Sequence, residues 1–593
     1  MRAPPRLSLA VLCGVALALF EPISVGAQNG PIQLFPKREP VQPGAPQTGP
    51  RPPSGTPAPA PPSGGSATTA APQGFQVEGL APPEIDSIGL SGPAEGGFER
   101  TLWAGSDPQL VLALLPELPV TSANPPLREL IRRLLATGAP LDGGPTGGRM
   151  LGARVERLLA MGDLDTAKRL LDQLPPERGD SQLARLAAQA ALLEGDDPGA
   201  CQRANDLAPT GGTAFWAEIA IYCRLAAGDE EGARLGLDLL REAGHADPGF
   251  FRLAGAVANH QADGAGPAMR SPAAVDVALL RLAGQSLPAT SLGNLPPAVL
   301  TVAAREPKLA RDRQLEIAER AFEGGGLAAS DLGAIYGERA PAGDALTSVR
   351  TAWGPQARAM AYRAAGEQRS PQDLAALMAA TWQAARGDER LMIAEVFATR
   401  FGDLPVDRSL LAAGPGAARA LLTTDRPAPA AGWLALLKDE GSRDSRVQRE
   451  VAALAPLYAI TGIGGGAAPE LDEAAVAAWR AATPGADAKA ERLFALLDGL
   501  GLPVPGPVWW HELRPPLQQD ASVPVAALWA GLERAAAARR LGETVLFALT
   551  MLNGAPAAAE PEVLTACLRG LRSVGLDHEA RQIAVATALA MGL

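Results

Sequence analysis

MGDLDTAKRLLDQLP (residues 161–175), EGDDPGACQRANDLAP (194–209) and AGDEEGARLGLDLL (227–240) are three copies of one phrase in fixed register. Their Gly-Asp pairs recur every 33 residues, a spacing typical of helical-hairpin repeats. The spacing therefore predicts a scaffold of packed helices rather than the core of an enzyme.

Apolar residues keep the same register on both sides of each Gly-Asp pair. They recur in steps of four, which places them on one face of a helix. The positions before the Gly are Leu151, Ala184 and Ala217, then Val155, Ala188 and Ile221, then Leu159, Leu192 and Leu225; those after it include Ala167, Ala200 and Ala233. Gly suits the left-handed residue after a helix end, and Asp accepts hydrogen bonds from the N–H groups that open the next helix. Each pair thus predicts a hinge between two helices.

The segment 147–244 resembles the tetratricopeptide repeat (TPR) family. The family pattern has a Gly-Asp or Gly-Asn turn, followed five residues after the Gly by a small Ala where two helices cross closely, and this Ala is present in all three copies. The chain departs from the pattern by lacking the large aromatic residues of both helices and by displacing the closing proline to Pro175 and Pro209. The resemblance implies a degenerate, TPR-like, right-handed α-solenoid of antiparallel helical hairpins.

Helical patterns continue to residue 593, so the predicted fold class is all-α. We expect TPR-like repeats over 101–244, irregular helical repeats over 245–500 and C-terminal helical hairpins over 521–593, where the Gly-to-Ala spacing returns at Gly575 and Ala580. A chain of 593 residues with 47% hydrophobic but only 4% aromatic residues suits a repeat array built from Ala, Leu and Val. One continuous arc and two packed lobes are both compatible with these patterns.

The first 27 residues have the pattern of a secretory signal peptide. Two arginines precede an apolar run from Leu7 to Phe20, and a small-residue site favours cleavage after Ala27. The run is shorter than the ~20 residues of a membrane-spanning helix, so we expect no transmembrane segment after cleavage, a retained anchor being the alternative. The predicted location is periplasmic or secreted.

Residues 28–74 form a tail rich in Pro, Gly and Ser that cannot bury a core, and we expect it to be disordered. The following stretch, 75–100, is expected to be an extended segment lying on the first helices. The formal net charge of −11, without any Lys/Arg run, argues against a nucleic-acid partner.

Three cysteines remain after the signal. Cys201 and Cys223 lie at matching distances from the Gly211-Gly212 turn, so they should face each other across an antiparallel helix pair. In an oxidising compartment this predicts a structural disulfide; a redox pair is the alternative, without the close spacing of dithiol motifs. Cys567 is expected to be a buried small hydrophobe.

The stretch 501–520 holds the densest aromatic cluster, Trp509 and Trp510 followed by His511, in a Pro-rich segment expected to be a loop. These three residues are a possible binding surface, and the alternative is that the tryptophans plug the core. No two histidines have zinc-ligand spacing, so no metal is expected. His578 is expected to be an ordinary solvated residue.

No catalytic or cofactor-binding residue can be assigned. TGIGGGAA at 461–468 satisfies a loose dinucleotide pattern through Gly462, Gly464 and Ala467, but a helix end precedes it where that site needs a buried strand. We therefore expect no cofactor and no enzymatic activity. The predicted function is a noncatalytic exported scaffold that holds an unidentified protein or peptide in the bacterial cell envelope. The alternatives are an enzyme or enzyme accessory in cell-wall metabolism and a component of polysaccharide export.

Overall fold

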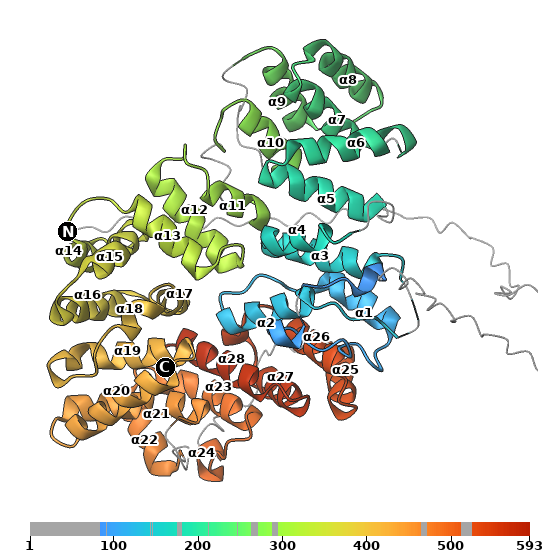
Figure 1. The fold of residues 1–593 in the computed structure, drawn as a ribbon. Coiled ribbons are helices and arrows are strands. Elements are labelled where there is room, and N and C mark those ends of the chain that lie inside the picture. The colour runs from blue at the N-terminus through green and yellow to red at the C-terminus, as the bar shows by residue number, and fades with distance from the viewer. Residues whose placement is uncertain are drawn as a thin grey trace, which may run out of the picture. The chain divides into compact units, whose positions relative to one another are not determined.

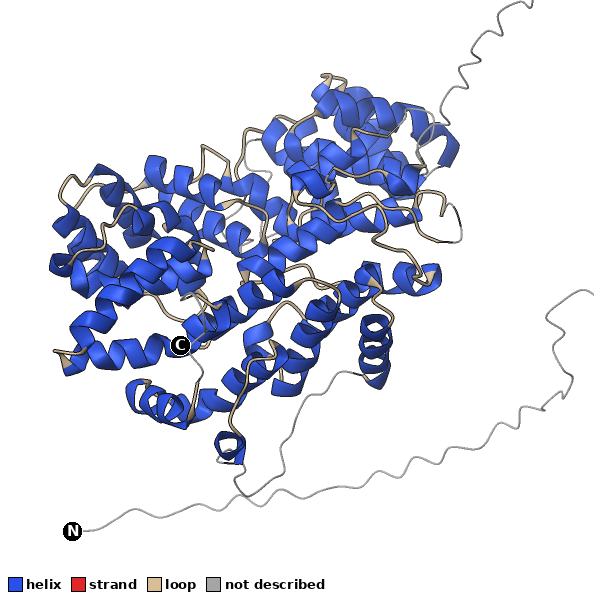
Figure 2. Ribbon diagram, turned by 60° about the horizontal axis from the view of Figure 1, so that its bottom comes forward, coloured by secondary structure: helices blue, strands red, loops and turns tan. Residues whose placement is uncertain are grey.

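The computed structural model describes residues 84–90, 92–142, 144, 146–174, 181–211, 213–245, 247–261, 271–287, 295–463, 471–510 and 525–593, with the backbone alone at 181, 207–211 and 510. Within these ranges the chain is all-α, with helices packed against their neighbours and no strand (Figure 2). The predicted signal peptide and tail, together with Gly464, Ala467 and His511, lie outside the described residues. None of the described helices combines the length and the apolarity that crossing a membrane requires.

The α-helices of the described residues are labelled in chain order (Figure 1). They are α1 (Pro108–Leu114), α2 (Pro125–Ala136), α3 (Arg149–Met161), α4 (Leu164–Leu171), α5 (Ser181–Glu194), α6 (Asp197–Gly211), α7 (Ala214–Ala226), α8 (Glu230–Glu242), α9 (Pro248–Ala258), α10 (Ala274–Leu282), α11 (Pro297–Ala304), α12 (Arg311–Gly324), α13 (Ala329–Arg339), α14 (Ala345–Thr351), α15 (Pro355–Glu367), α16 (Pro371–Ala384), α17 (Glu389–Val396), α18 (Ala398–Gly402), α19 (Gly414–Thr423), α20 (Pro427–Gly441), α21 (Ser445–Thr461), α22 (Glu473–Ala482), α23 (Ala486–Gly499), α24 (Gly506–Trp510), α25 (Ala526–Ala537), α26 (Leu541–Leu552), α27 (Pro561–Ser573) and α28 (Asp577–Ala590). Short 3₁₀ helices lie at Ile85–Ser87, Pro93–Glu95, Leu115–Glu117, Arg408–Ala413 and Pro556–Ala558.

The Gly-Asp hinges have the predicted geometry. Gly162 ends α3 in the left-handed conformation, with φ of 88°, and the Asp163 carboxylate accepts from the Thr166 N–H at 3.1 Å. The pairs at 195–196 and 228–229 repeat this arrangement. The alanines that follow, Ala167, Ala200 and Ala233, are fully buried, as close helix crossings require. The prediction of paired helices around these hinges is confirmed.

The segment that precedes α1 is held on α3 by a buried aspartate. The Asp86 carboxylate accepts hydrogen bonds from the backbone N–H groups of Thr146, Gly148, Met150 and Leu151, at 2.8 to 3.3 Å. These groups open α3 and would otherwise lack partners. The segment therefore supplies the N-terminal cap of the first repeat helix from a distance of some sixty residues along the chain.

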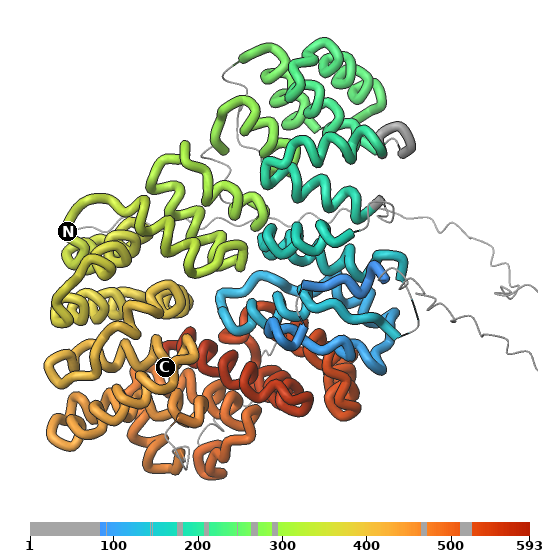
Figure 3. The backbone as a smooth tube through the Cα atoms, in the orientation of Figure 1, coloured from blue at the N-terminus to red at the C-terminus, as the bar shows by residue number. Residues whose placement is uncertain are grey.

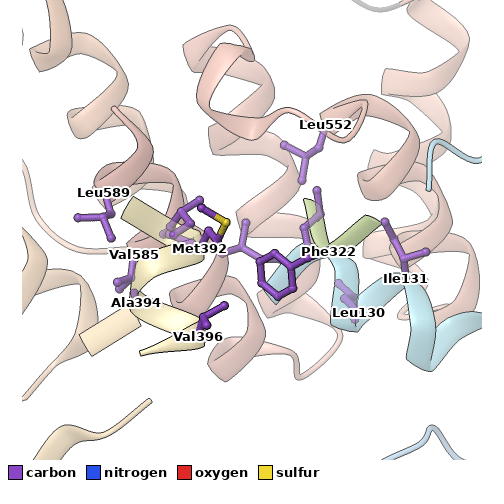
Figure 4. Close-up of a cluster of buried hydrophobic side chains, with 14 of the residues drawn as sticks. Leu130, Ile131, Phe322, Met392, Ala394, Val396, Leu552, Val585 and Leu589 are labelled. Carbon is purple, nitrogen blue, oxygen red and sulfur yellow. The ribbon is translucent and has the colours of Figure 1, made fainter. Parts of the chain in front are cut away.

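One hydrophobic core joins helices from the beginning, middle and end of the described chain. Figure 4 shows Leu130 and Ile131 of α2 beside Phe322 of α12, together with side chains of α17, α26 and α28. In a strictly linear repeat array each hairpin contacts only its neighbours. Here α28 packs against α2, so the two ends of the helical array share a core.

Helices α6–α10, which we call the disulfide lobe, have a second core that they share with α5. The tube in Figure 3 shows the chain passing through this lobe between α5 and α11. The last helix of the lobe, α10, packs on α5, and the next helix, α11, packs on α3 in the main core. The lobe is thus inserted between neighbouring helices of the main core.

Candidate binding cavity

A cavity lies where α2 and α28 meet the turns between other helices. Its volume is about 660 Å³, and its wall includes the Gly-Asp hinge before α4, the turn between α12 and α13, part of α17 and the turn between α19 and α20. Six separate segments of the chain therefore build it. A volume of this size accommodates a small molecule or a few residues of a peptide.

Carboxylates outnumber cations in the cavity wall. Seven acidic side chains face three guanidinium groups, so the lining has a formal charge of −4 with His578 neutral. The acids are Glu129, Asp163, Asp165, Asp331, Glu395, Asp425 and Glu579, and the bases are Arg128, Arg132 and Arg133. The cavity is therefore strongly acidic.

The three arginines of α2 are each paired with an acid from a different segment of the chain. Arg128 contacts Glu395 at 3.0 Å, Arg132 contacts Asp163 at 2.7 Å and Arg133 contacts Glu579 at 2.6 Å. Burial raises the pKa of Glu395, opposed by the charge of Arg128. These pairs fix the wall by linking α2 to α17, α4 and α28.

The other four acids are more exposed, and one of them, Glu129, also contacts Arg132 at 2.8 Å. Asp165, Asp331 and Asp425 keep 68%, 44% and 55% of their side chains exposed. Arg305 is shared by the first two at 3.4 and 3.6 Å, and His578 lies 3.4 Å from the third. Solvent-facing carboxylates at the mouth of a cavity attract a cationic group.

Two threonine hydroxyls of the cavity wall are engaged within their own helix. Thr423 and Thr424 donate their hydroxyls to the backbone carbonyls of Arg419 and Ala420, each at 2.8 Å. The wall presents charge and hydrogen-bond acceptors, which suit binding.

The predicted Cys201–Cys223 disulfide is present. It joins α6 to α7 in the disulfide lobe, with a Cα–Cα distance of 5.6 Å. Cys567 is a fully buried free thiol in α27, and burial raises its pKa. Both predictions are confirmed, and neither site lies at the acidic cavity.

The expectation of a loop around the tryptophans is wrong in part, because Gly506–Trp510 forms the short helix α24. The N–H groups of a first helical turn have no partner within the helix, so proline, which lacks an N–H, is tolerated there. Pro507 lies in the first turn of α24. The Trp509 ring is partly buried and packs edge-on against Phe494, with the ring centres 5.6 Å apart. Trp509 therefore acts as a core residue, whereas the side chains of Trp510 and His511 lie outside the described residues.

Sequence patterns did not reveal the cavity, because its wall comes from six separate segments. His578 is exposed, as expected for a solvated residue, but it also lies at the cavity mouth. One partial signal was the Gly-Asp hinge itself, since Asp163 both caps α4 and binds Arg132. No group of three His, Cys, Asp or Glu side chains in the described parts of the chain has metal-site geometry.

Comparisons of this chain with models of protein families, with curated proteins and with solved structures yield no match.

Proposed function

We propose that this chain is a noncatalytic, exported scaffold of the bacterial cell envelope, built as a TPR-like, right-handed α-solenoid, that binds a cationic segment of a partner protein in the acidic cavity. The observation that carries the proposal is the surplus of carboxylates around a cavity of about 660 Å³. Repeat proteins commonly hold extended segments on surfaces made by several hairpins.

Charge complementarity selects the occupant. Each exposed ion pair contributes about 0.2 to 1 kcal/mol, so three of them together would change affinity roughly three- to 150-fold. The surrounding negative potential would also accelerate association with a basic segment at low salt. A Lys- or Arg-rich peptide therefore fits the cavity better than an acidic or purely apolar one.

The test uses fluorescence anisotropy with a labelled hexa-arginine peptide and a hexa-glutamate peptide as comparison. A variant with Asp165→Asn, Asp331→Asn and Asp425→Asn should bind hexa-arginine at least threefold more weakly than the unaltered protein. These side chains are exposed, so the substitutions should leave the fold intact.

The matched control is Asp238→Asn, Asp403→Asn and Asp498→Asn, which changes net charge equally at exposed sites outside the cavity. Equal losses in the two triple variants would show that the peptide responds only to net charge and would refute the cavity assignment. Export is tested separately by fusing residues 1–27 to a reporter enzyme that becomes active only after oxidation outside the cytoplasm. An inactive fusion would refute the export part of the proposal.

A further inference from the structure

A second cavity, of about 450 Å³, has the opposite charge. Its wall comes from the end of α16, the start of α17, α19, α21 and the residues that follow α22 and α28. We call it the arginine cavity because Arg386, Arg390 and Arg419 line it with Glu450 as the one carboxylate side chain. The lining thus has a formal charge of +2 within a chain whose net charge is −11.

Nearby groups do not cancel this positive charge. The Lys489 ammonium donates to the Gly592 carbonyl at 3.0 Å and adds a fourth cation at the edge. An α-carboxylate on Leu593 would offset one of these charges. Burial lowers the pKa of Arg390, and the neighbouring Arg419 and Arg386 guanidiniums lower it further. The cations are therefore close enough to repel one another.

Two of the arginines have no carboxylate partner among the described side chains. Arg390 donates from Nε to the Ala385 carbonyl at 3.3 Å, and its guanidinium lies 5.9 Å from the centre of the Trp382 ring. Arg386 donates from Nη1 to the carbonyls of Gln383 and Ala385. Each guanidinium has five N–H donors, so both keep donors for another acceptor.

Arg419 is the most buried of the three, with 12% of its side chain exposed. Its Nε donates to the Leu593 carbonyl at 3.3 Å, and its Nη1 lies 3.6 Å from Glu450, whose own side chain is half exposed. This single, loosely placed carboxylate leaves most of the positive charge uncompensated.

A threonine gives a second, independent indication of a ligand. Thr483 lines the arginine cavity and is only 7% exposed, yet its hydroxyl has no hydrogen-bond partner in the described part of the chain. A buried hydroxyl without a partner is destabilising, because it has lost its hydrogen bonds to water. An oxygen of a bound molecule would remove this cost by accepting from the hydroxyl.

We infer that the arginine cavity binds a small organic molecule carrying at least two oxyanion charges, in the form of carboxylate or phosphate groups. The planar guanidiniums of Arg386 and Arg390 provide paired donors suited to either oxyanion. Ala379, Ala412 and Pro415, in the same wall and none of them buried, offer an apolar surface to the carbon skeleton. The inference concerns a different cavity from the proposed peptide site and stands without it.

The test is isothermal titration calorimetry at constant ionic strength with citrate, with glucose 6-phosphate and with inorganic phosphate. Binding of citrate alone would identify a carboxylate ligand, and binding of glucose 6-phosphate would identify a phosphate monoester. Arg386→Gln and Arg390→Gln should each weaken the interaction about tenfold, since a charge-assisted hydrogen bond is lost. Thr483→Val should weaken it several-fold while leaving thermal stability unchanged or higher.

The control is Arg569→Gln, which removes an equal charge at an exposed site outside the cavity. The inference is overturned if none of the three anions binds at millimolar concentration to the folded protein. It is equally overturned if Arg386→Gln, whose parent side chain is exposed, binds as the unaltered chain does, or if Arg569→Gln loses as much affinity.

Discussion

Acidification should stabilise the disulfide lobe through one carboxyl group. Asp276 lies in the first turn of α10 and is 3% exposed. Its Oδ2 accepts from the Ala273 N–H at 2.8 Å, whereas its Oδ1 has no partner among the described residues. Burial, reinforced by the charges of Asp247 and Glu218, raises the pKa of Asp276 to about 6.

The sign of the effect follows from proton binding. The pKa of an unfolded aspartate is about 3.8, so between this value and about pH 6 the open state has lost its proton while the folded state retains it. Stability of the lobe therefore falls as pH rises through this window and stays low above it. A difference of about 2 pKa units corresponds to about 3 kcal/mol in full. Between about pH 5 and pH 7.5, the opening equilibrium should increase roughly tenfold.

Hydrogen exchange of the α10 amides, corrected for intrinsic rates, measures this opening. Asp276→Asn carries no charge but retains an oxygen for the Ala273 N–H, so it should exchange more slowly than the unaltered protein at pH 7.5 and lose the Asp276 contribution to pH dependence. Asp238→Asn in α8 removes an exposed acid of the same lobe and should leave the dependence unchanged. If Asp276→Asn and the unaltered chain show the same pH dependence, the assignment to Asp276 is refuted.

Three further perturbations test other parts of the structure. Phe322→Ala, in the core that joins α2, α12 and α17, should lower the free energy of unfolding by about 3 to 5 kcal/mol in urea titrations, because it removes a buried side chain. Leu239→Ala, at an exposed position, should change it by less than about 0.5 kcal/mol. Cys223→Ser should destabilise the disulfide lobe by about 3 kcal/mol because it opens a loop of 22 residues; proteolysis of the lobe should then be faster and insensitive to reductant. Glu319→Gln should cost about 1.5 to 3 kcal/mol, because the buried Arg358 guanidinium loses the carboxylate it binds at 2.6 Å and keeps only Glu389 at 3.0 Å. Adding Arg358→Met should restore part of the loss in the same urea titration.

Local rules account for the part of the fold that the sequence predicted. The Gly-Asp hinges, the buried alanines after them and the Cys201–Cys223 pair all depend on residues close together along the chain or on consecutive helices. Helical periodicity and capping are sufficient to predict such features. The same rules misassigned 506–510, where a proline-rich stretch still forms one turn of helix.

Long-range packing was outside the reach of these rules. α2 packs against α28, and both line the acidic cavity. This contact depends on the sum of the small rotations of each helix relative to the one before it. Arg133 and Glu579 are 446 residues apart along the chain, so no local sequence pattern indicates that they form an ion pair. The cap of α3 by Asp86 could not be predicted for the same reason, because the carboxylate and the N–H groups that it binds belong to separate segments of the chain.

Helix ends account for part of the charge of each cavity. Acidic residues stabilise the first turn of a helix and basic residues the last, because backbone N–H groups are free at one end and carbonyls at the other. The acidic cavity collects first-turn acids: Asp165 of α4, Asp331 of α13 and Glu579 of α28. The arginine cavity collects the terminal residues of α16, α22 and α28, where Arg386 and Lys489 donate to free carbonyls.

Helix ends do not account for Arg390, in the first turn of α17, or for Arg419, within α19, and they do not account for the excess of positive charge. A carbonyl at a helix end has only a partial negative charge, so the guanidiniums that bind it remain largely uncompensated. The α2 arginines show the alternative, since each is neutralised by a carboxylate within 3.0 Å. In the arginine cavity the corresponding carboxylates are missing from the described wall apart from Glu450. An oxyanion supplied from solution would complete the arrangement that the α2 arginines complete within the chain.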